Sequence, residues 1–212
     1  QGRTKVGNLG LSLCTGEYFN FLDDDDILYF DHIEVLVKLL NNCSAVAAYT
    51  IAEEGQIVRD RNNPAVFKEK RTIVRYKQPF NRLLLYSFNY LPIQSVLFSR
   101  KLYDKLGGFD ESLDILEDWD LWIRYSTMGD FVFEPKITSK YYVPFRGKNK
   151  ASRGKGMDAA LKQVEQKFAS YPIVCDVRSL RKDMDYVINV YNQKGILYYM
   201  KQVWNFFVYG ER

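Results

Sequence analysis

The segment 17–40, EYFNFLDDDDILYFDHIEVLVKLL, places four consecutive aspartates between an apolar stretch and an amphipathic one. Residues 17–22 have the composition of a β-strand. After Asp31 the apolar residues recur at helical spacing, and Glu34 follows three residues later, as in a capping box. We therefore expect a strand over 17–22, a helix that begins after Asp31, and an acidic run at the edge of the core.

Four adjacent aspartates repel one another unless a cation or hydrogen-bond donors offset their charge. In an extended strand alternate side chains face opposite ways, so Asp23 and Asp25 would share one face and Asp24 and Asp26 the other. One suitable partner is Mg²⁺, which takes one or two protein carboxylates and completes its shell with phosphate oxygens. The alternative is a solvated acidic turn before a helix, and the run taken alone favours that alternative.

A second acidic cluster lies in the segment 107–124, GGFDESLDILEDWDLWIR. Glu117 and Asp118 begin a predicted helix beside Trp119 and Trp122. A carboxylate next to aromatic rings is well placed to act as a general base, and the rings offer a stacking surface for a sugar. Alternatively, the acids complement the helix dipole and the tryptophans lie in the core. Taken alone, the cluster favours this second interpretation.

The segment 143–156, VPFRGKNKASRGKG, is basic and rich in glycine. Such a segment could fold over a diphosphate, although by itself it is more typical of a solvated linker. The net charge of +4 over 212 residues is modest and does not call for a nucleic-acid partner. Three widely spaced cysteines predict a reducing compartment, so we expect a cytoplasmic protein. No apolar stretch reaches the length of about 18–20 residues that a membrane span requires.

Strands alternate with helices as far as about residue 142, which predicts an α/β fold. We expect strands over 44–52, 94–99 and 131–135, a turn at 53–56, and a loop over 60–80. Helices are expected over 100–108 and 117–130, and again after Lys155. The last stretch, 195–212, is aromatic and amphipathic; it fits a core helix, a homo-oligomer interface or a peripheral membrane contact at the inner face of the membrane.

The order and spacing of these pieces resemble the family 2 glycosyltransferases. Members carry Asn-x-Gly, then Gly-Glu-Tyr, then a Leu-Asp-x-Asp-Asp run that contains the metal-binding DxD; here these are Asn8 to Gly10, GEY at 16–18, and FLDDDD. The segment 96–135, with its GGFD and EDWDLW runs, looks like a second block of the same family. The resemblance covers about residues 1–145, with 50–90 matching loosely.

The resemblance implies a GT-A fold, a Rossmann-like and mainly parallel sheet flanked by helices. It implies a domain over 1–150 and a helical C-terminal extension over 151–212. The family's PxxN and DDxS nucleotide-binding strands have no counterpart here, so the fold is expected to be incomplete at its N-terminus, and these 212 residues alone should transfer little sugar. The implied enzyme is an inverting transferase that uses a nucleotide-sugar donor, Mg²⁺ or Mn²⁺, and a glycan or lipid-linked acceptor, in polysaccharide or surface-glycan synthesis.

The resemblance also implies roles for single residues. Asp118 would be the catalytic base, and Asp25 with Asp23 would bind the metal; the register Asp24 and Asp26 also spells DxD. The residues implied in substrate binding are Asp23, Asp24, Glu117, Trp119, Asn8 and Lys148. Lys148 stands where many members have a histidine, which weakens the case for a metal and leaves a second hypothesis, a non-catalytic sugar- or nucleotide-binding module.

Overall fold

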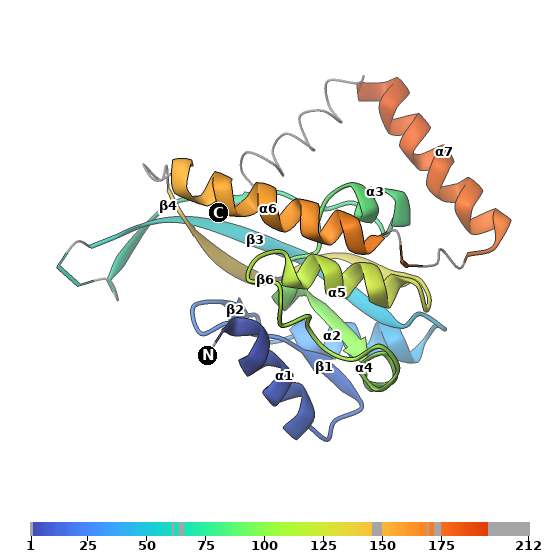
Figure 1. Ribbon diagram of the computed structural model, residues 1–212, viewed down its shortest axis with the longest axis horizontal. Coiled ribbons are helices and arrows are strands. Elements are labelled where there is room, and N and C mark those ends of the chain that lie inside the picture. The colour runs from blue at the N-terminus through green and yellow to red at the C-terminus, as the bar shows by residue number, and fades with distance from the viewer. Residues whose placement is uncertain are drawn as a thin grey trace.

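The computed structural model describes residues 2–60, 62–63, 66–145, 150–168, 170–171 and 175–194. Lys148 and the aromatic stretch 195–212 lie outside these ranges. The elements, in chain order, are α1 (Arg3–Leu13), β1 (Tyr18–Asn20), β2 (Ile27–Leu28), α2 (His32–Asn41), β3 (Ala47–Arg59), β4 (Phe67–Val74), α3 (Arg82–Ser87), the 3₁₀ helix η1 (Ile93–Ser95), β5 (Val96–Ser99), α4 (Arg100–Leu106), α5 (Glu117–Ser126), β6 (Phe131–Pro144), α6 (Lys150–Phe168) and α7 (Val177–Lys194) (Figure 1).

A mixed sheet forms the centre of the molecule. Its strand order is β1-β5-β3-β6-β2, with β4 paired to β3. The predicted α/β class is confirmed, but the expected mainly parallel sheet is not what the described strands form. Only β3 and β6 run parallel, whereas the other four described pairings are antiparallel. A parallel pair needs a long crossover, and here the chain between β3 and β6 provides it with α3, α4 and α5.

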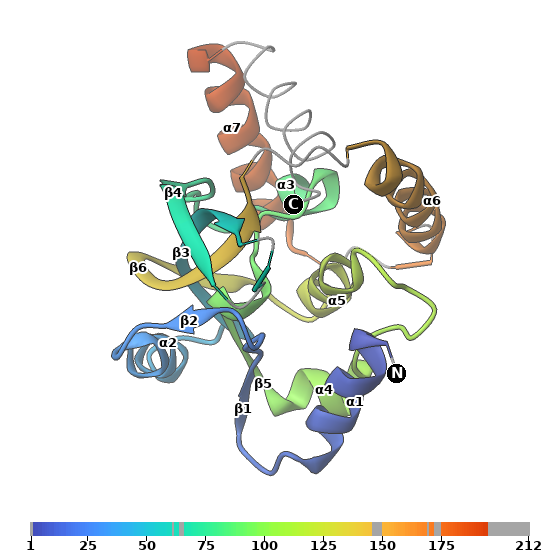
Figure 2. The same ribbon diagram turned by 90° about the vertical axis from the view of Figure 1, so that its left-hand side faces the viewer.

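Helices cover both faces of the sheet (Figure 2). On one face α2 buries Leu36 and Leu40 against Ala48 and Leu97. The other face carries α1, α4, α5 and α6, and the main core lies there around α5. Because α5 is buried on most sides, it can fix the position of polar groups at its first turn.

Strand β3 continues through the segment EEGQ at 53–56, where the sequence predicted a turn. Both of its edges are paired there, with β4 on one side and β6 on the other. Gly55 allows this close packing, because a Cβ atom at that position would lie 2.6 Å from Cδ1 of Tyr142. The glycine thus marks a close approach between strands rather than a chain reversal.

The chain reverses later, between β3 and β4, in the region predicted to be a loop. Asp60 accepts hydrogen bonds from the backbone N–H groups of Asn62 (2.7 Å) and Asn63 (2.9 Å), and its own N–H donates to Val66 O (2.8 Å). β4 is exposed along most of its length. Its polar composition suits an exposed strand and is equally typical of a loop, so the sequence alone does not distinguish the two.

The helix expected after Asp31 is present as α2, but the predicted capping box is wrong. The Asp31 side chain makes no cap hydrogen bond and pairs instead with Lys136, while Glu34 pairs with Lys38 on the next turn. Downstream, α4 ends at Gly107, whose φ of 74° is the left-handed conformation that glycine adopts readily. The helix thus ends close to the position that the sequence predicts.

In the described part of the C-terminal region, α6 begins at Lys150 and α7 at Val177, in agreement with the helical periodicity after Lys155. Met157, Leu161 and Val164 of α6 are buried in the main core, beside α5. The division into a domain over 1–150 and an extension over 151–212 stays a prediction. Within the described part of the chain, no helix combines the length and apolar character needed to cross a bilayer.

Candidate active site

The two acidic segments meet around one cavity of about 520 Å³. Asp23, Asp25 and Asp26 line it from the turn after β1, and Glu117 and Asp118 line it from the start of α5. Further lining side chains come from α1, β3, β6, α6 and the loops between elements, among them Arg3, Glu54, Arg75, Tyr76, Asn89, Tyr141, Tyr142 and Met157. Carboxylates that lie far apart in the sequence therefore face a common space.

The aspartate run folds as a tight turn rather than as the end of a strand. The N–H of Asp26 donates to Asp23 O at 3.1 Å, so the strand alternation expected for the four side chains does not hold. Asp26 faces the cavity together with Asp23 and Asp25, whereas Asp24 is exposed and is absent from the cavity lining. Burial, followed by the charges of Asp23 and Asp25, raises the pKa of Asp26 to about 7.

Two arginines offset the charge of this turn. Arg3 of α1 lies 2.7 Å from Asp23 Oδ2 and 3.5 Å from Glu117 Oε1, so it bridges the two acidic segments. Arg59 at the end of β3 lies 3.0 Å from Asp25 Oδ2. The side chains of both arginines and both aspartates are substantially exposed, whereas that of Glu117 is buried. We therefore expect each arginine–aspartate pair to contribute little to stability, and we expect other cations to replace the arginines readily.

Helix α5 begins with an unusual backbone conformation. Leu116, the residue before it, has φ 65° and ψ 19°, which lies in the left-handed region. For a bulky residue this conformation costs roughly 1–2 kcal/mol, and burial of the leucine side chain in the main core helps to hold it. The turn brings Glu117 and Asp118 to the cavity, and their negative charge suits the first turn of a helix.

Asp118 is held by donors on both carboxylate oxygens. Its Oδ1 accepts a hydrogen bond from its neighbour's backbone, Trp119 N, at 2.8 Å, and its Oδ2 accepts one from Asn89 Nδ2 at 2.9 Å. Burial, and then the charge of Glu117, raises the pKa of Asp118 to about 7. Burial also raises the pKa of Glu117. A carboxyl that titrates near neutral pH in a cleft has the properties of a general base.

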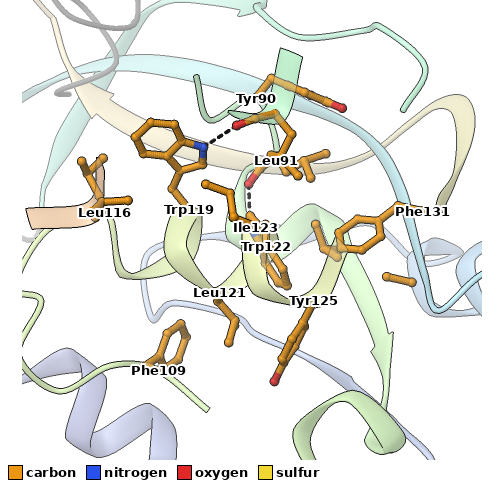
Figure 3. Packing of buried hydrophobic residues seen from close by; sticks show 14 of the residues in the cluster. Tyr90, Leu91, Phe109, Leu116, Trp119, Leu121, Trp122, Ile123, Tyr125 and Phe131 are labelled. Carbon is orange, nitrogen blue, oxygen red and sulfur yellow. Dashed lines mark hydrogen bonds between the residues drawn. The ribbon is translucent and has the colours of Figure 1, made fainter. Parts of the chain in front are cut away.

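The tryptophans beside these acids belong to the core, as Figure 3 shows. Trp119 is 2% exposed, and its Nε1–H donates to Leu85 O at 2.6 Å. Trp122 is fully buried, and its Nε1–H donates to Leu91 O at 3.1 Å. The expectation that Trp119 contacts the substrate is therefore wrong, because its ring packs inward against the core.

Asn8 also lies away from the cavity. Its Oδ1 accepts from Phe109 N at 2.7 Å, and its Nδ2 donates to Phe109 O at 3.0 Å. Gly108 comes so close that a Cβ atom there would collide with Asn8 Oδ1. The structure thus gives Asn8 a different task from the expected substrate contact: it joins α1 to the GGFD segment.

Several polar residues of the cavity carry no sequence motif and were not predicted. Arg75 donates to both carboxylate oxygens of Glu54, at 2.7 Å and 2.6 Å, and Tyr141 donates to the same carboxylate at 3.1 Å. Arg75 lies in the stretch predicted to be a loop, and Asn89 follows a short helix that sequence periodicity did not indicate.

Among the described residues, no group of three or more His, Cys, Asp or Glu side chains is arranged to hold a metal ion. The chemistry of the aspartate turn nevertheless fits Mg²⁺ or Mn²⁺. These ions prefer oxygen ligands, and Mg²⁺ is commonly bound through one or two carboxylates plus phosphate oxygens. Asp23 and Asp25 provide two such carboxylates at the cavity.

The single histidine, His32, is buried at the start of α2, with Nδ1 2.6 Å from Thr138 Oγ1.

Comparison with known proteins adds a family and a fold. The sequence model described as "Glycosyltransferase like family 2" matches residues 1–174. The chain is 30% identical over 142 residues to an uncharacterized glycosyltransferase of Rickettsia felis. That alignment covers 63% of this chain and 22% of the relative. The chain is 27% identical over 143 residues to the chondroitin synthase of Escherichia coli, and this alignment covers 65% of this chain and 19% of the synthase. The chain thus spans about a fifth of the length of these two relatives.

Among solved structures, S. aureus TarS 1–349 in complex with UDP-GlcNAc aligns with a TM-score of 0.58 at 12% identity, covering 96% of this chain and 59% of that one. The same protein in complex with UDP aligns with a TM-score of 0.57, covering 90% and 52%. At this identity the likeness concerns the fold alone. It confirms the GT-A fold expected from the sequence.

Proposed function

Because the chain belongs to glycosyltransferase-like family 2, we propose that it forms part of an inverting glycosyltransferase that moves a sugar from a nucleotide-diphosphate donor to an acceptor hydroxyl. One observation carries the proposal: an aspartate turn and a buried carboxylate with a raised pKa face the same cavity. The first suits a diphosphate with its cation, and the second suits an acceptor hydroxyl. These two segments of one cleft support the two chemical requirements of the proposed transfer.

Asp118 is the proposed base. It takes the proton of the acceptor hydroxyl as that oxygen bonds to the anomeric carbon and the bond from this carbon to the diphosphate oxygen breaks. A single displacement of this kind inverts the configuration of the anomeric carbon. A pKa of about 7 leaves a substantial fraction of Asp118 ionised at neutral pH, and such a base also binds the transferred proton better than an ordinary aspartate does.

Asp23 and Asp25 are the proposed ligands of Mg²⁺ or Mn²⁺. When bound, such an ion offsets the negative charge that develops on the leaving diphosphate. Arg3 and Arg59, which now pair with these two aspartates, lie close enough to the turn to contact phosphate oxygens once released. Glu117 stays a proposed sugar contact, since it lines the cavity. Asp24 and Lys148 stay predictions, the first on an exposed turn position and the second outside the described residues.

We further propose that the acceptor is a glycan or a lipid-linked glycan and that the enzyme works in the cytoplasm, where its three free cysteines would stay reduced. The name of the chondroitin synthase relative supports a role in building a polysaccharide. Contact of the C-terminal helices with a membrane or with a second copy is part of this proposal. Liposome flotation of the natural protein, with and without residues 195–212, tests the membrane contact.

The proposed function is tested with the natural polypeptide that contains this chain. Nucleotide-sugar donors are screened with Mg²⁺ or Mn²⁺ for thermal shift, hydrolysis and transfer. Asp118→Asn should bind donor with unchanged affinity and lose transfer by about 10³-fold or more, because the general base is removed. Asp25→Ala should weaken the metal-dependent part of donor binding. Donor binding without any turnover by the wild type would instead favour the non-catalytic sugar- or nucleotide-binding module.

A further inference from the structure

Asn89 lies in the connection between α3 and η1, and both ends of its amide are engaged. Its Nδ2 donates to Asp118 Oδ2 at 2.9 Å, and its Oδ1 accepts from Leu91 N at 3.1 Å. The residue lines the same cavity as Asp118. One end of the amide therefore fixes the connection, and the other holds the carboxylate.

Two tryptophans of α5 attach it to α3, at Leu85, and to the connection after α3, at Leu91. The indole of Trp119 donates to Leu85 O, and that of Trp122 donates to Leu91 O, so the two hydrogen bonds lie on either side of Asn89 in the sequence (Figure 3). Both rings are buried and cannot move without disturbing the core. These hydrogen bonds thereby fix the position of Asn89 relative to Asp118, although the two residues come from separate segments.

We infer that Asn89 is the positioning residue of the base: it fixes the orientation of the Asp118 carboxylate and keeps it able to accept a proton from an acceptor hydroxyl. The inference rests on the proposed function. Each carboxylate oxygen can accept about two hydrogen bonds, so Trp119 N and Asn89 Nδ2 each occupy one site and leave further sites for the acceptor. An amide has no proton to lose near neutral pH, so it donates to Asp118 throughout the reaction.

The hydrogen bond also acts on the charge of Asp118. This donor favours the ionised carboxylate, as do the backbone N–H of Trp119 and the charge of Arg3 of α1, whereas burial and the neighbouring Glu117 favour the protonated acid. Asn89 therefore opposes those two effects. Tyr76, which also lies near Asp118, stays neutral because burial raises its pKa to about 12. Removing the donor should leave a base that is protonated, and so inactive, over a wider pH range.

Asn89→Asp provides the sharpest test, because it preserves the shape of the side chain and keeps an acceptor for Leu91 N while removing the donor to Asp118. We expect the acid limb of the pH profile for kcat to move upward by about one pH unit or more, with kcat at pH 7 about tenfold lower and the donor KM within about twofold of wild type. Asn89→Ala should move the limb in the same direction by less, since it adds no negative charge.

A role confined to folding predicts the reverse order, with Asn89→Ala more damaging than Asn89→Asp. An unchanged acid limb of the pH profile in a folded Asn89→Asp protein would overturn the inference. If Asn89→Asp does not fold, an unchanged acid limb in Asn89→Ala would overturn it instead. Ser87→Ala is the matched control on the same segment, because Ser87 is exposed and bonds only locally to Leu83 O in the described contacts. It should leave the profile unchanged.

Infrared titration of the carboxyl band that disappears in Asp118→Asn gives a readout independent of turnover. The midpoint of this band should rise in Asn89→Asp. If the wild type transfers no sugar from any donor, the proposed function fails while the infrared titration still tests the hydrogen bond. If the wild type is active and the midpoint does not move, only the inference about Asn89 fails.

Discussion

Asp118 occupies a position in which its charged form is disfavoured, and this has consequences for stability as well as for chemistry. Its pKa is raised to about 7 in the folded protein, first by burial and then by Glu117, whereas an aspartate of the unfolded chain titrates near its ordinary value of 3.8. The folded state therefore binds the proton more tightly. The stability that this proton contributes is fully present below about pH 4 and is lost as the pH rises through about 7.

We therefore predict that Asp118→Asn stabilises the protein at high pH. The asparagine removes the buried charge, so at pH 8 the free energy of unfolding should exceed that of wild type by about 1–2 kcal/mol, an amount reduced because the cavity is open to solvent. At pH 4 the two proteins should be nearly equal. Urea unfolding at both pH values measures the difference, and equal stability at pH 8 would show that the folded protein does not raise this pKa.

Individual motif residues differ in how far the sequence revealed their place. Asp23, Asp25 and Asp118 were predicted to face a site, and the structure places all three at one cavity. Trp119 and Asn8 belong to the same motifs but hold the framework together. A motif records that a residue is needed without saying whether it touches a ligand or the protein, and only the packing separates these cases.

Among the elements, helix α1 shows how two distant motifs support one another. The sequence did not predict this helix, since Gly7 and Gly10 lower the helical propensity of its middle. Gly7 is nevertheless required for packing, because a Cβ atom there would lie 2.6 Å from Cε2 of Phe109. Gly7, one of the two glycines that made the helix hard to predict, thus allows it to lie against the GGFD segment.

We predict that Gly108→Ala weakens the contact between α1 and the GGFD segment. The new methyl group would collide with Asn8 Oδ1 and lie 3.0 Å from Cδ1 of Leu11, so the free energy of unfolding should fall by about 1–3 kcal/mol. Gly10→Ala is the matched control on α1, where a Cβ atom meets nothing within 4 Å, and it should stabilise the helix by about 0.5–1 kcal/mol. Thermal unfolding compares the two, and equal effects would contradict the predicted packing.

The strands show the limit of local patterns more clearly. The helices at 32–41 and 117–126 have strong periodicity, and both were predicted close to their observed positions. In contrast, β3 passes through a segment that looks like a turn, and β4 looks like a loop. Strand pairing is set by partners far away in the sequence, here Tyr142 opposite Gly55, so a window of neighbouring residues carries little information about it.

At the scale of the whole molecule, a buried charge joins α6, and Tyr171 just after it, to the helix that carries the site. Asp120 of α5 is completely buried, and its carboxylate contacts Arg124 Nε at 2.8 Å, Lys167 Nζ at 2.6 Å and the Tyr171 hydroxyl at 2.8 Å. Lys167 also reaches Asp110 Oδ2 at 2.6 Å, in the GGFD segment. α6 is thus tied to both parts of the second family motif.

We predict that Lys167→Met destabilises the whole described core rather than α6 alone. The substitution leaves Asp120 buried with one cation fewer, a change that typically costs about 3–5 kcal/mol when a buried pair is broken; Arg124 and Tyr171 should reduce this to about 2–3 kcal/mol. Lys162→Met is the control, because Lys162 is exposed on the same helix, and it should change stability by less than about 0.5 kcal/mol.

Urea unfolding followed by tryptophan fluorescence and by far-ultraviolet circular dichroism distinguishes the two cases. Trp119 packs against Phe168 of α6, with ring centroids 5.3 Å apart, so its fluorescence reports on the junction, whereas circular dichroism reports on all helices. If α6 and the α/β part form one cooperative unit, both signals should shift together to lower urea in Lys167→Met. A fluorescence change that precedes the loss of helical signal would instead show that α6 separates first, as a true boundary near residue 150 requires.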